Sequence, residues 1–211
     1  MLCLFDLDGT LIDSGQSIYA GIRYALASVA VEAPDESVLR DWIGPPLRLS
    51  FSELLGDHDR VEAALDAYRQ RFAEIGWREH TVYPGIPAAI DALHRAGHRM
   101  AVVTSKLRTH AEPILAELPF GQRFARLYGP GPDSLQSEKA SMIATALADF
   151  HADPTDTVMI GDRRYDIEGA VANQVRGIGV LWGFGDRHEL EQAGAHVTVE
   201  TPAQLTDLLL G

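Results

Sequence analysis

Two aspartates near the start of the chain, Asp6 and Asp8, have the types and spacing that could do chemistry. They follow the apolar run 2–5, which reads as a buried strand of a parallel sheet, and Gly9-Thr10 then breaks the run into a loop. Side chains alternate along a strand, so we expect both carboxylates on the same side. Two like charges held this close need a cation or a proton between them. The pattern therefore fits a metal-assisted nucleophile, and it equally fits an Asp-Gly turn after a buried strand.

Polar residues also follow two other apolar segments, 100–103 and 157–160. Strands separated by helices imply a parallel sheet with right-handed crossovers, so the carboxyl ends of these segments share one edge. Ligands of open α/β sheets bind at that edge. The residues that the topology gathers there are Asp6, Asp8, Thr104, Ser105, Asp162 and Asp166, with Lys139 arriving from a neighbouring helix.

The elements that must position these residues fall into two kinds. From about 14 to 83 the apolar residues recur at helical spacing without a convincing strand, which predicts an inserted helical domain. The rest alternates helices and strands, so we predict an α/β core domain at 1–13 and 84–211 and a helical domain at 14–83. Within the helical domain, the turn 42–48 reads either as a loop that faces the site or as a plain helix–helix connection. The further strands expected in the core are 100–103, about 124–128, 157–160, 179–182 and an edge strand at 196–199.

The composition of the chain limits the classes of protein to which it can belong. With 211 residues, 46% of them apolar, the chain can bury a sizeable core. The net charge of -12 argues against a nucleic-acid or acidic-membrane surface, because phosphate backbones are bound by basic footprints. The single cysteine, Cys3, excludes a disulfide within the chain and reads as a buried structural thiol. Without a signal peptide or a long apolar run, we expect a cytoplasmic protein with no membrane partner.

Lysine usage points to the same edge of the sheet. The chain has sixteen arginines and only two lysines, Lys106 and Lys139, and both fall where the topology places the site. Lysine offers a phosphate a compact point charge, whereas a solvated surface accepts either cation.

Four motifs, in this order and spacing, resemble those of the haloacid dehalogenase superfamily. They are Asp6-Leu7-Asp8-Gly9-Thr10, Thr104, Lys139 and Gly161-Asp162-Arg163-Arg164-Tyr165-Asp166. The chain looks most like the phosphoglycolate phosphatase-like branch, with a helical cap inserted after the first motif. The resemblance covers essentially the whole chain and implies an α/β fold, a Rossmann-like core with a parallel sheet plus an α-helical cap domain.

The resemblance also implies roles for the charged residues. Asp6 would attack phosphorus and form an aspartyl phosphate, while Asp8 would protonate the leaving oxygen and later activate a water molecule. Mg²⁺ would be held by Asp6, by Asp8 through its backbone carbonyl, and by Asp162. Asp166 would support the metal or orient Lys139.

Further contacts follow from the same resemblance. Thr104 and Lys139 would stabilise the charge of the transferring phosphoryl group. The residues implied to bind phosphate are Gly9, Thr10, Thr104, Ser105 and Lys139. The expected substrate contacts are Gly44, Pro45, Arg48 and Lys106.

These roles predict a Mg²⁺-dependent phosphatase for a small phosphorylated metabolite, with 2-phosphoglycolate as the first candidate, in a monomer or homodimer. Asp8 argues against a dehalogenase, which lacks that acid, and a cap without lysine argues against a phosphonatase. A sugar-phosphate mutase of the β-phosphoglucomutase kind, and a 5′-nucleotidase or pyrophosphatase of the same fold, stay open. A non-enzymatic scaffold is the alternative from another class, and failure to bind Mg²⁺ would indicate it.

Overall fold

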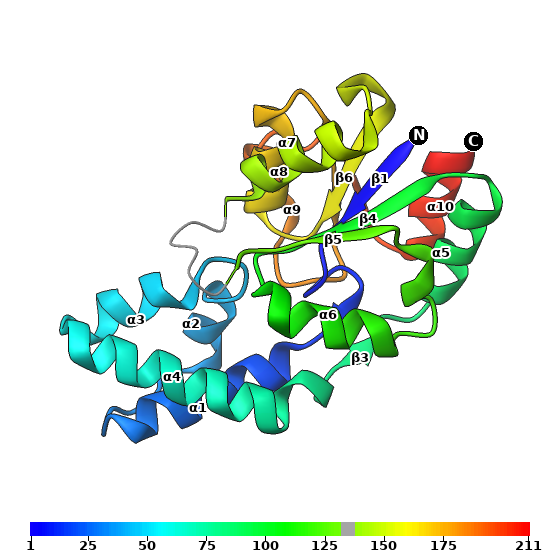
Figure 1. Ribbon diagram of the computed structural model, residues 1–211. Helices are drawn as coiled ribbons and strands as arrows, with labels where there is room; N and C mark the ends of the chain where they lie inside the picture. Colours follow the sequence, from blue (N-terminus) through cyan, green and yellow to red (C-terminus); the bar gives the residue numbers. More distant parts are fainter. Residues whose placement is uncertain (132–137) are drawn as a thin grey trace. The chain divides into compact units, whose positions relative to one another are not determined.

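A computed structural model describes residues 1–131 and 138–211 of the chain (Figure 1). The described chain divides into two compact units, one made of Met1–Asp13 with Val82–Gly211 and the other of Ser14–Thr81. The short strands β2 (Ile12–Asp13) and β3 (Thr81–Val82) pair where the chain leaves and re-enters the first unit. Our expectation of no strand between 14 and 83 missed β3, because two residues are too few to show a period.

The first unit is built on a parallel sheet. Among the described residues, six strands pair in the order β5-β4-β1-β6-β7-β8, and every pairing is parallel. The central strand β1 lies between β4 and β6, with Phe5 opposite Val102 on one side and Ile160 on the other. The strands are β1 (Leu2–Phe5), β4 (Arg99–Val103), β5 (Arg126–Tyr128), β6 (Thr157–Gly161), β7 (Arg176–Val180) and β8 (Val197–Val199). The predicted α/β class is confirmed.

Helices cover both faces of this sheet (Figure 1). Helix α8 packs against α7 and α9 on one face, whereas α10 packs against α5 on the other. The helices and 3₁₀ turns of this unit are α5 (Ile86–Arg95), α6 (Arg108–Glu117), η2 (Gly121–Arg123), α7 (Lys139–Phe150), η3 (Pro154–Asp156), α8 (Arg164–Ala172), α9 (Arg187–Gln192) and α10 (Pro202–Leu210). This two-sided cover explains why the central strands read as continuous apolar runs.

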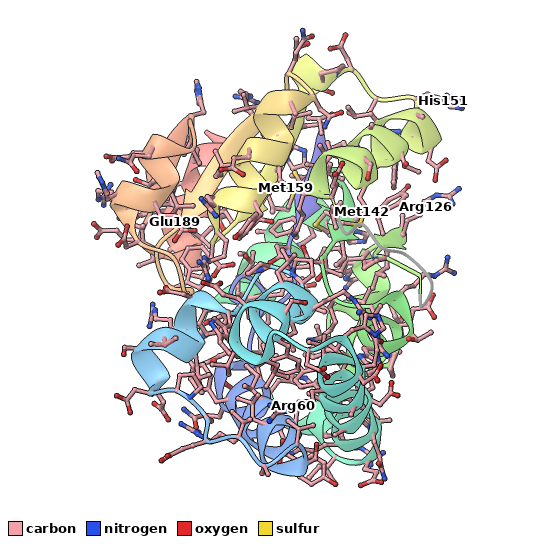
Figure 2. All side chains as sticks on the ribbon, turned by 90° about the vertical axis from the view of Figure 1, so that its left-hand side faces the viewer. Arg60, Arg126, Met142, His151, Met159 and Glu189 are labelled. Atoms are coloured by element: carbon pink, nitrogen blue, oxygen red, sulfur yellow. The ribbon has the colours of Figure 1, made fainter. Side chains whose placement is uncertain are left out.

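The core of the unit lies between the sheet and these helices. All of β1 is buried, and Met142 of α7 packs against the buried cluster that includes Met159 of β6 (Figure 2). Burial raises the pKa of the Cys3 thiol to about 12. Because the thiolate is the reactive form, Cys3 is a structural residue, as its place in an apolar strand predicts.

The second unit is helical. Its elements are α1 (Gly15–Ser28), α2 (Glu36–Asp41), α3 (Leu47–Leu55), α4 (His58–Glu74) and η1 (Gly76–Arg78), with α4 packed on both α1 and α3. Gly56 ends α3 in the left-handed conformation, and the Asp57 carboxylate then accepts the Arg60 amide at 2.9 Å to begin α4. In the part of the chain that the structure covers, no helix has the length and apolarity to cross a membrane.

Candidate active site

The predicted site residues stand at the carboxyl ends of neighbouring strands. Asp6 directly follows β1, Thr104 follows β4, and Asp162 follows β6. Sheet hydrogen bonding continues past the strand ends, since the Asp6 amide donates to the Ile160 carbonyl and the Thr104 amide to the Tyr128 carbonyl, each at 2.9 Å. Backbone hydrogen bonding in the sheet therefore fixes the backbone positions from which the side chains of Asp6 and Thr104 project.

Lys139, the first residue of α7, joins two of the acids. Its ammonium lies 2.6 Å from Asp6 Oδ1 and 2.6 Å from Asp166 Oδ1, and it donates to the Val103 carbonyl at 2.7 Å. Burial alone would lower the pKa of Lys139, but the carboxylates of Asp166 and Asp6 outweigh it and raise that pKa. Lys139 is therefore a charged group held in a fixed place, and Asp166 is positioned to orient it.

A buried acidic cluster lies beside this ammonium. Among the described residues, Asp6, Asp162 and Asp166 each offer a carboxylate oxygen, and these oxygens lie within 4.8 Å of one another. Burial, with a smaller contribution from the Asp166 carboxylate, raises the pKa of Asp6 to about 7 despite the opposing effect of Lys139. Burial is also the largest cause that raises the pKa of Asp162, and the neighbouring carboxylates of Asp6 and Asp166 act in the same direction. A compact, all-oxygen donor set with more negative than positive charge fits a hard divalent cation.

Asp162 is fully buried and held from two sides. The Phe184 amide donates to its Oδ2 at 2.8 Å, and the Thr10 hydroxyl donates to its Oδ1 at 3.3 Å. Gly9 has φ +88°, and a Cβ there would lie 2.2 Å from Asp162 Oδ2, so only glycine fits. The Gly9 amide already donates to the Ile12 carbonyl at 2.8 Å. Gly9 and Thr10 thus support Asp162, and their expected contact with phosphate stays a prediction.

Asp8 is paired with the second lysine. Lys106 Nζ lies 2.9 Å from Asp8 Oδ2, with both side chains mostly buried. The buried Thr104 hydroxyl accepts the Lys106 amide at 3.1 Å, so a tight turn holds Lys106 and the half-buried Ser105 after β4. Lys106 thus pairs with Asp8 in this structure, and its expected contact with substrate stays a prediction. Each acid of the first motif therefore has its own lysine.

The remaining predicted residues belong to the helical unit. Gly44 and Pro45 are half-buried in the turn between α2 and α3, and Gly44 has φ +112°. Arg48 on α3 forms a two-pronged ion pair with Glu62 on α4, in which Nη2 lies 3.0 Å from Oε2. This pair links α3 to α4, and the substrate contacts expected at Gly44, Pro45 and Arg48 stay predictions.

Sequence reasoning missed the segment 182–185. We placed the last core strand at 179–182, but β7 is Arg176–Val180 and ends before Trp182. The Trp182 indole N–H donates instead to the Thr10 carbonyl at 3.0 Å, and Phe184 supplies the amide that holds Asp162. The available signal was a glycine-rich stretch at the carboxyl end of a strand, the edge at which the other polar residues gather.

Comparison with known proteins places this geometry in a family. The model of the haloacid dehalogenase-like hydrolases matches residues 3–180. A 5′-nucleotidase of Pseudomonas aeruginosa is 38% identical over 89% of this chain and 85% of its own length. Tyrosine-protein kinase PtkA of Mycobacterium tuberculosis is 33% identical over 99% of this chain and 70% of its own. Phosphoglycolate phosphatase 1 of P. aeruginosa is 29% identical over 99% and 78%.

A solved structure of a related protein supports the same family. The crystal structure of a predicted phosphatase from Clostridium acetobutylicum superposes with a TM-score of 0.93 at 36% identity, over 99% of this chain and 97% of that one. The family match includes the carboxyl ends of β1, β4 and β6, which carry the acids and the threonine described above. The chain therefore belongs to the haloacid dehalogenase-like hydrolase family, in its phosphatase-like branch.

Proposed function

We propose that this protein is a Mg²⁺-dependent phosphomonoesterase that acts on a small phosphorylated metabolite through an aspartyl phosphate on Asp6. The observation that carries the proposal is the Lys139 ammonium, 2.6 Å from both Asp6 and Asp166, beside the buried Asp162. A fixed cation next to a nucleophilic carboxylate serves phosphoryl transfer, in which charge stabilisation and positioning supply most of the catalysis.

The carboxylates of Asp6 and Asp162, with the backbone carbonyl of Asp8, would hold the Mg²⁺. When bound, the cation would neutralise charge on the carboxylates and on the phosphoryl oxygens. Asp6 needs such a neighbour, because burial raises its pKa to about 7 and only its ionised form is a nucleophile. Lys139 supplies part of that positive charge from the protein.

The chain's own residues carry the reaction. A carboxylate oxygen of Asp6 bonds to phosphorus while the ester P–O bond breaks, and Asp8 gives its proton to the leaving oxygen. Asp8 then takes a proton from water, whose oxygen bonds to phosphorus while the bond between Asp6 and phosphorus breaks, which releases inorganic phosphate and restores the Asp6 carboxylate. Lys139 stays beside the reacting carboxylate throughout, while Lys106 holds Asp8 at 2.9 Å before substrate arrives.

The substrate we propose first is 2-phosphoglycolate, which suits the phosphatase branch that the motifs resemble. A 5′-nucleotide is the second candidate, because the relative at 38% identity is named 5′-nucleotidase. We propose no nucleic-acid or membrane partner, in keeping with the net charge of -12.

The test is phosphate release by the wild type and by Asp6→Asn. The panel contains 2-phosphoglycolate, 5′-nucleotides, sugar phosphates, pyrophosphate and an aryl phosphate, each with Mg²⁺ and with chelator. We expect turnover that chelator abolishes and that Asp6→Asn lacks, and the best substrate names the specificity.

Other outcomes would redirect the assignment. Isomerised sugar phosphate without net phosphate release would indicate a mutase. Because one relative is named a tyrosine kinase, a reaction with ATP and a tyrosine peptide is run alongside, and labelled peptide without monoester hydrolysis would overturn the phosphatase. A wild type that is inert on every compound and binds no Mg²⁺ would leave a scaffold protein.

A further inference from the structure

We propose that the loop after β7, residues 182–185, is a positioning segment that fixes Asp162 and the Thr10 loop in the geometry needed to bind a divalent cation. We call it the β7 loop. The inference rests on the proposed function, because it concerns the metal affinity of the same site. None of the residues of this loop belongs to the four motifs, so it adds a further determinant of the site.

The first contact is on the metal-binding acid itself. The Phe184 amide donates to Asp162 Oδ2 at 2.8 Å, where the carboxylate is fully buried. A backbone amide on one oxygen fixes the rotation of the carboxylate and favours its ionised form. Phe184 thus acts through its backbone, whatever its ring does.

The second contact joins the same loop to the first motif. The Trp182 indole donates to the Thr10 carbonyl at 3.0 Å, and the Thr10 hydroxyl in turn reaches Asp162 Oδ1 at 3.3 Å. The β7 loop therefore ties together the turns that follow β1 and β6. These are the two turns that supply Asp6, Asp8 and Asp162.

The glycines of the loop allow its close approach. A Cβ on Gly183 would lie 2.3 Å from the Gly9 carbonyl oxygen and 2.4 Å from Asp162 Cβ. A Cβ on Gly185 would lie 2.0 Å from the Asp162 carbonyl oxygen. Side chains at these positions would push the loop away from Asp162, so the backbone contact requires glycine.

The far end of the loop is anchored to the other side of Asp162. The Asp186 carboxylate accepts the Glu189 amide at 2.8 Å and begins α9. Glu189 on α9 (Figure 2) then accepts Arg163 Nε at 2.9 Å and the Arg164 amide at 2.8 Å. Because Arg163 directly follows Asp162, the loop and the acid are held at both ends, which limits the motion of the carboxylate before a cation binds.

The main experiment measures Mg²⁺ binding by calorimetry without substrate, for the full-length protein and two variants of one residue. Phe184→Pro removes the amide donor, whereas Phe184→Ala keeps it and removes only the ring. We expect Phe184→Pro to weaken Mg²⁺ binding by about tenfold or more, the range for groups that orient metal ligands. Phe184→Ala should stay within about twofold of the wild type.

If Phe184→Pro prevents folding, two further pairs of variants test the role of the β7 loop. Trp182→Phe removes the indole donor and keeps an aromatic ring, with Trp77→Phe in the helical unit as its control. Gly183→Ala forces the loop away, and Gly131→Ala is its control because, among the residues that the structure describes, a Cβ there meets nothing within 4 Å. Each site variant should weaken Mg²⁺ binding while its control does not. At saturating Mg²⁺ the site variants should recover most of their turnover, which separates positioning of the metal site from a role in the chemistry.

The outcomes separate the two proposals. If the wild type binds Mg²⁺ and hydrolyses monoesters, and the folded site variants bind Mg²⁺ as tightly as their controls, the loop's role is overturned and the phosphatase stands. If the wild type neither binds Mg²⁺ nor hydrolyses any monoester, the proposed function fails and this inference fails with it.

Discussion

Lys139 and Lys106 each pair with one acid of the first motif, and this pairing sets the charge balance of the site. Lys139 is buried and lies between Asp6 and Asp166, while Asp162 adds a further buried carboxylate. Arginine, which the chain uses sixteen times, would bring a larger planar group into the same space. The choice of lysine at both positions is therefore explained by the compactness of the ammonium.

Replacing Lys139 tests this balance. We expect Lys139→Met to lower kcat by about 100-fold or more, because the charge beside the reacting carboxylate is lost. We also expect it to reduce the free energy of unfolding of the metal-free protein by about 3–5 kcal/mol, because buried carboxylates lose their partner. Steady-state kinetics and urea unfolding check both, with the exposed Arg69→Met as the control. A variant as stable and as active as the wild type would contradict the central role of Lys139.

The stability of the metal-free protein should depend on Asp6 in a pH-dependent way. Burial raises the pKa of Asp6 from 3.8 to about 7, so folding takes up a proton between these values. The free energy of unfolding therefore falls as the pH rises from about 4 to about 7. Removing the charge with Asp6→Asn should stabilise the metal-free protein at pH 7.5 by roughly 1–3 kcal/mol and have little effect near pH 4.

Urea unfolding at both pH values in chelator measures this difference, and Asp207→Asn on the exposed face of α10 is the control. Equal stability of Asp6→Asn and the wild type at pH 7.5 would show that the buried charge is already compensated. Added Mg²⁺ should stabilise the wild type more than the variant, because binding to the folded state adds to its stability.

At the scale of elements, the turn after β4 organises the second lysine. Thr104 Oγ1 accepts the Lys106 amide, which turns the chain so that Lys106 Nζ can reach Asp8. Thr104→Val keeps the shape and removes the acceptor, so we expect kcat to fall about 10–100-fold, whereas Thr104→Ser should keep most of it. Kinetics with Mg²⁺ and the best substrate test this, and a loss of kcat in Thr104→Ser that Thr104→Val does not show would assign the effect to packing of the methyl group.

The strands were predicted correctly from the sequence where burial requires apolar residues. The apolar runs 2–5, 100–103 and 157–160 became β1, β4 and β6, and the parallel order brought Asp6, Thr104 and Asp162 to one edge. The β7 loop was missed because its key contact comes from a backbone amide at residue 184, which any residue except proline could supply. The pairing of Lys106 with Asp8 was missed because a lysine side chain reaches several neighbours, and only the fold selects one.

At the scale of the whole molecule, the net charge of the protein has the same sign as the charge of its proposed substrates. The chain carries a net charge of -12, yet its proposed substrates are anions. We therefore expect little long-range attraction of the substrate, and we propose that its binding rests on the cation, on Lys139 and on Lys106 within the site. We expect kcat/KM for 2-phosphoglycolate to change by less than about threefold between 50 and 300 mM salt at constant free Mg²⁺. A steep loss of kcat/KM with salt would instead indicate a basic surface that steers the substrate.

The division of the chain into units makes a last prediction. Asp6, Asp8, Lys139, Asp162 and the β7 loop all belong to the unit Met1–Asp13 with Val82–Gly211, and so do all pairings of the parallel sheet. The strands β2 and β3 pair, so the chain ends left by removing Ser14–Thr81 lie close enough for a short Gly/Ser linker. We expect this shortened protein to bind Mg²⁺ within about threefold of the wild-type affinity, because every residue of the proposed donor set lies in the unit that remains.

Calorimetry measures the binding, and near-ultraviolet circular dichroism establishes that the shortened protein is folded. The same shortened protein with Asp162→Asn is the control and should lose the binding. If the folded core binds Mg²⁺ far more weakly than the full chain, the helical unit must contribute to the metal site, and the donor set assigned to the α/β unit alone would be incomplete. Substrate turnover provides a separate reading, because Gly44, Pro45 and Arg48 are absent from the shortened protein: retained metal binding with raised KM would assign the helical unit to substrate recognition.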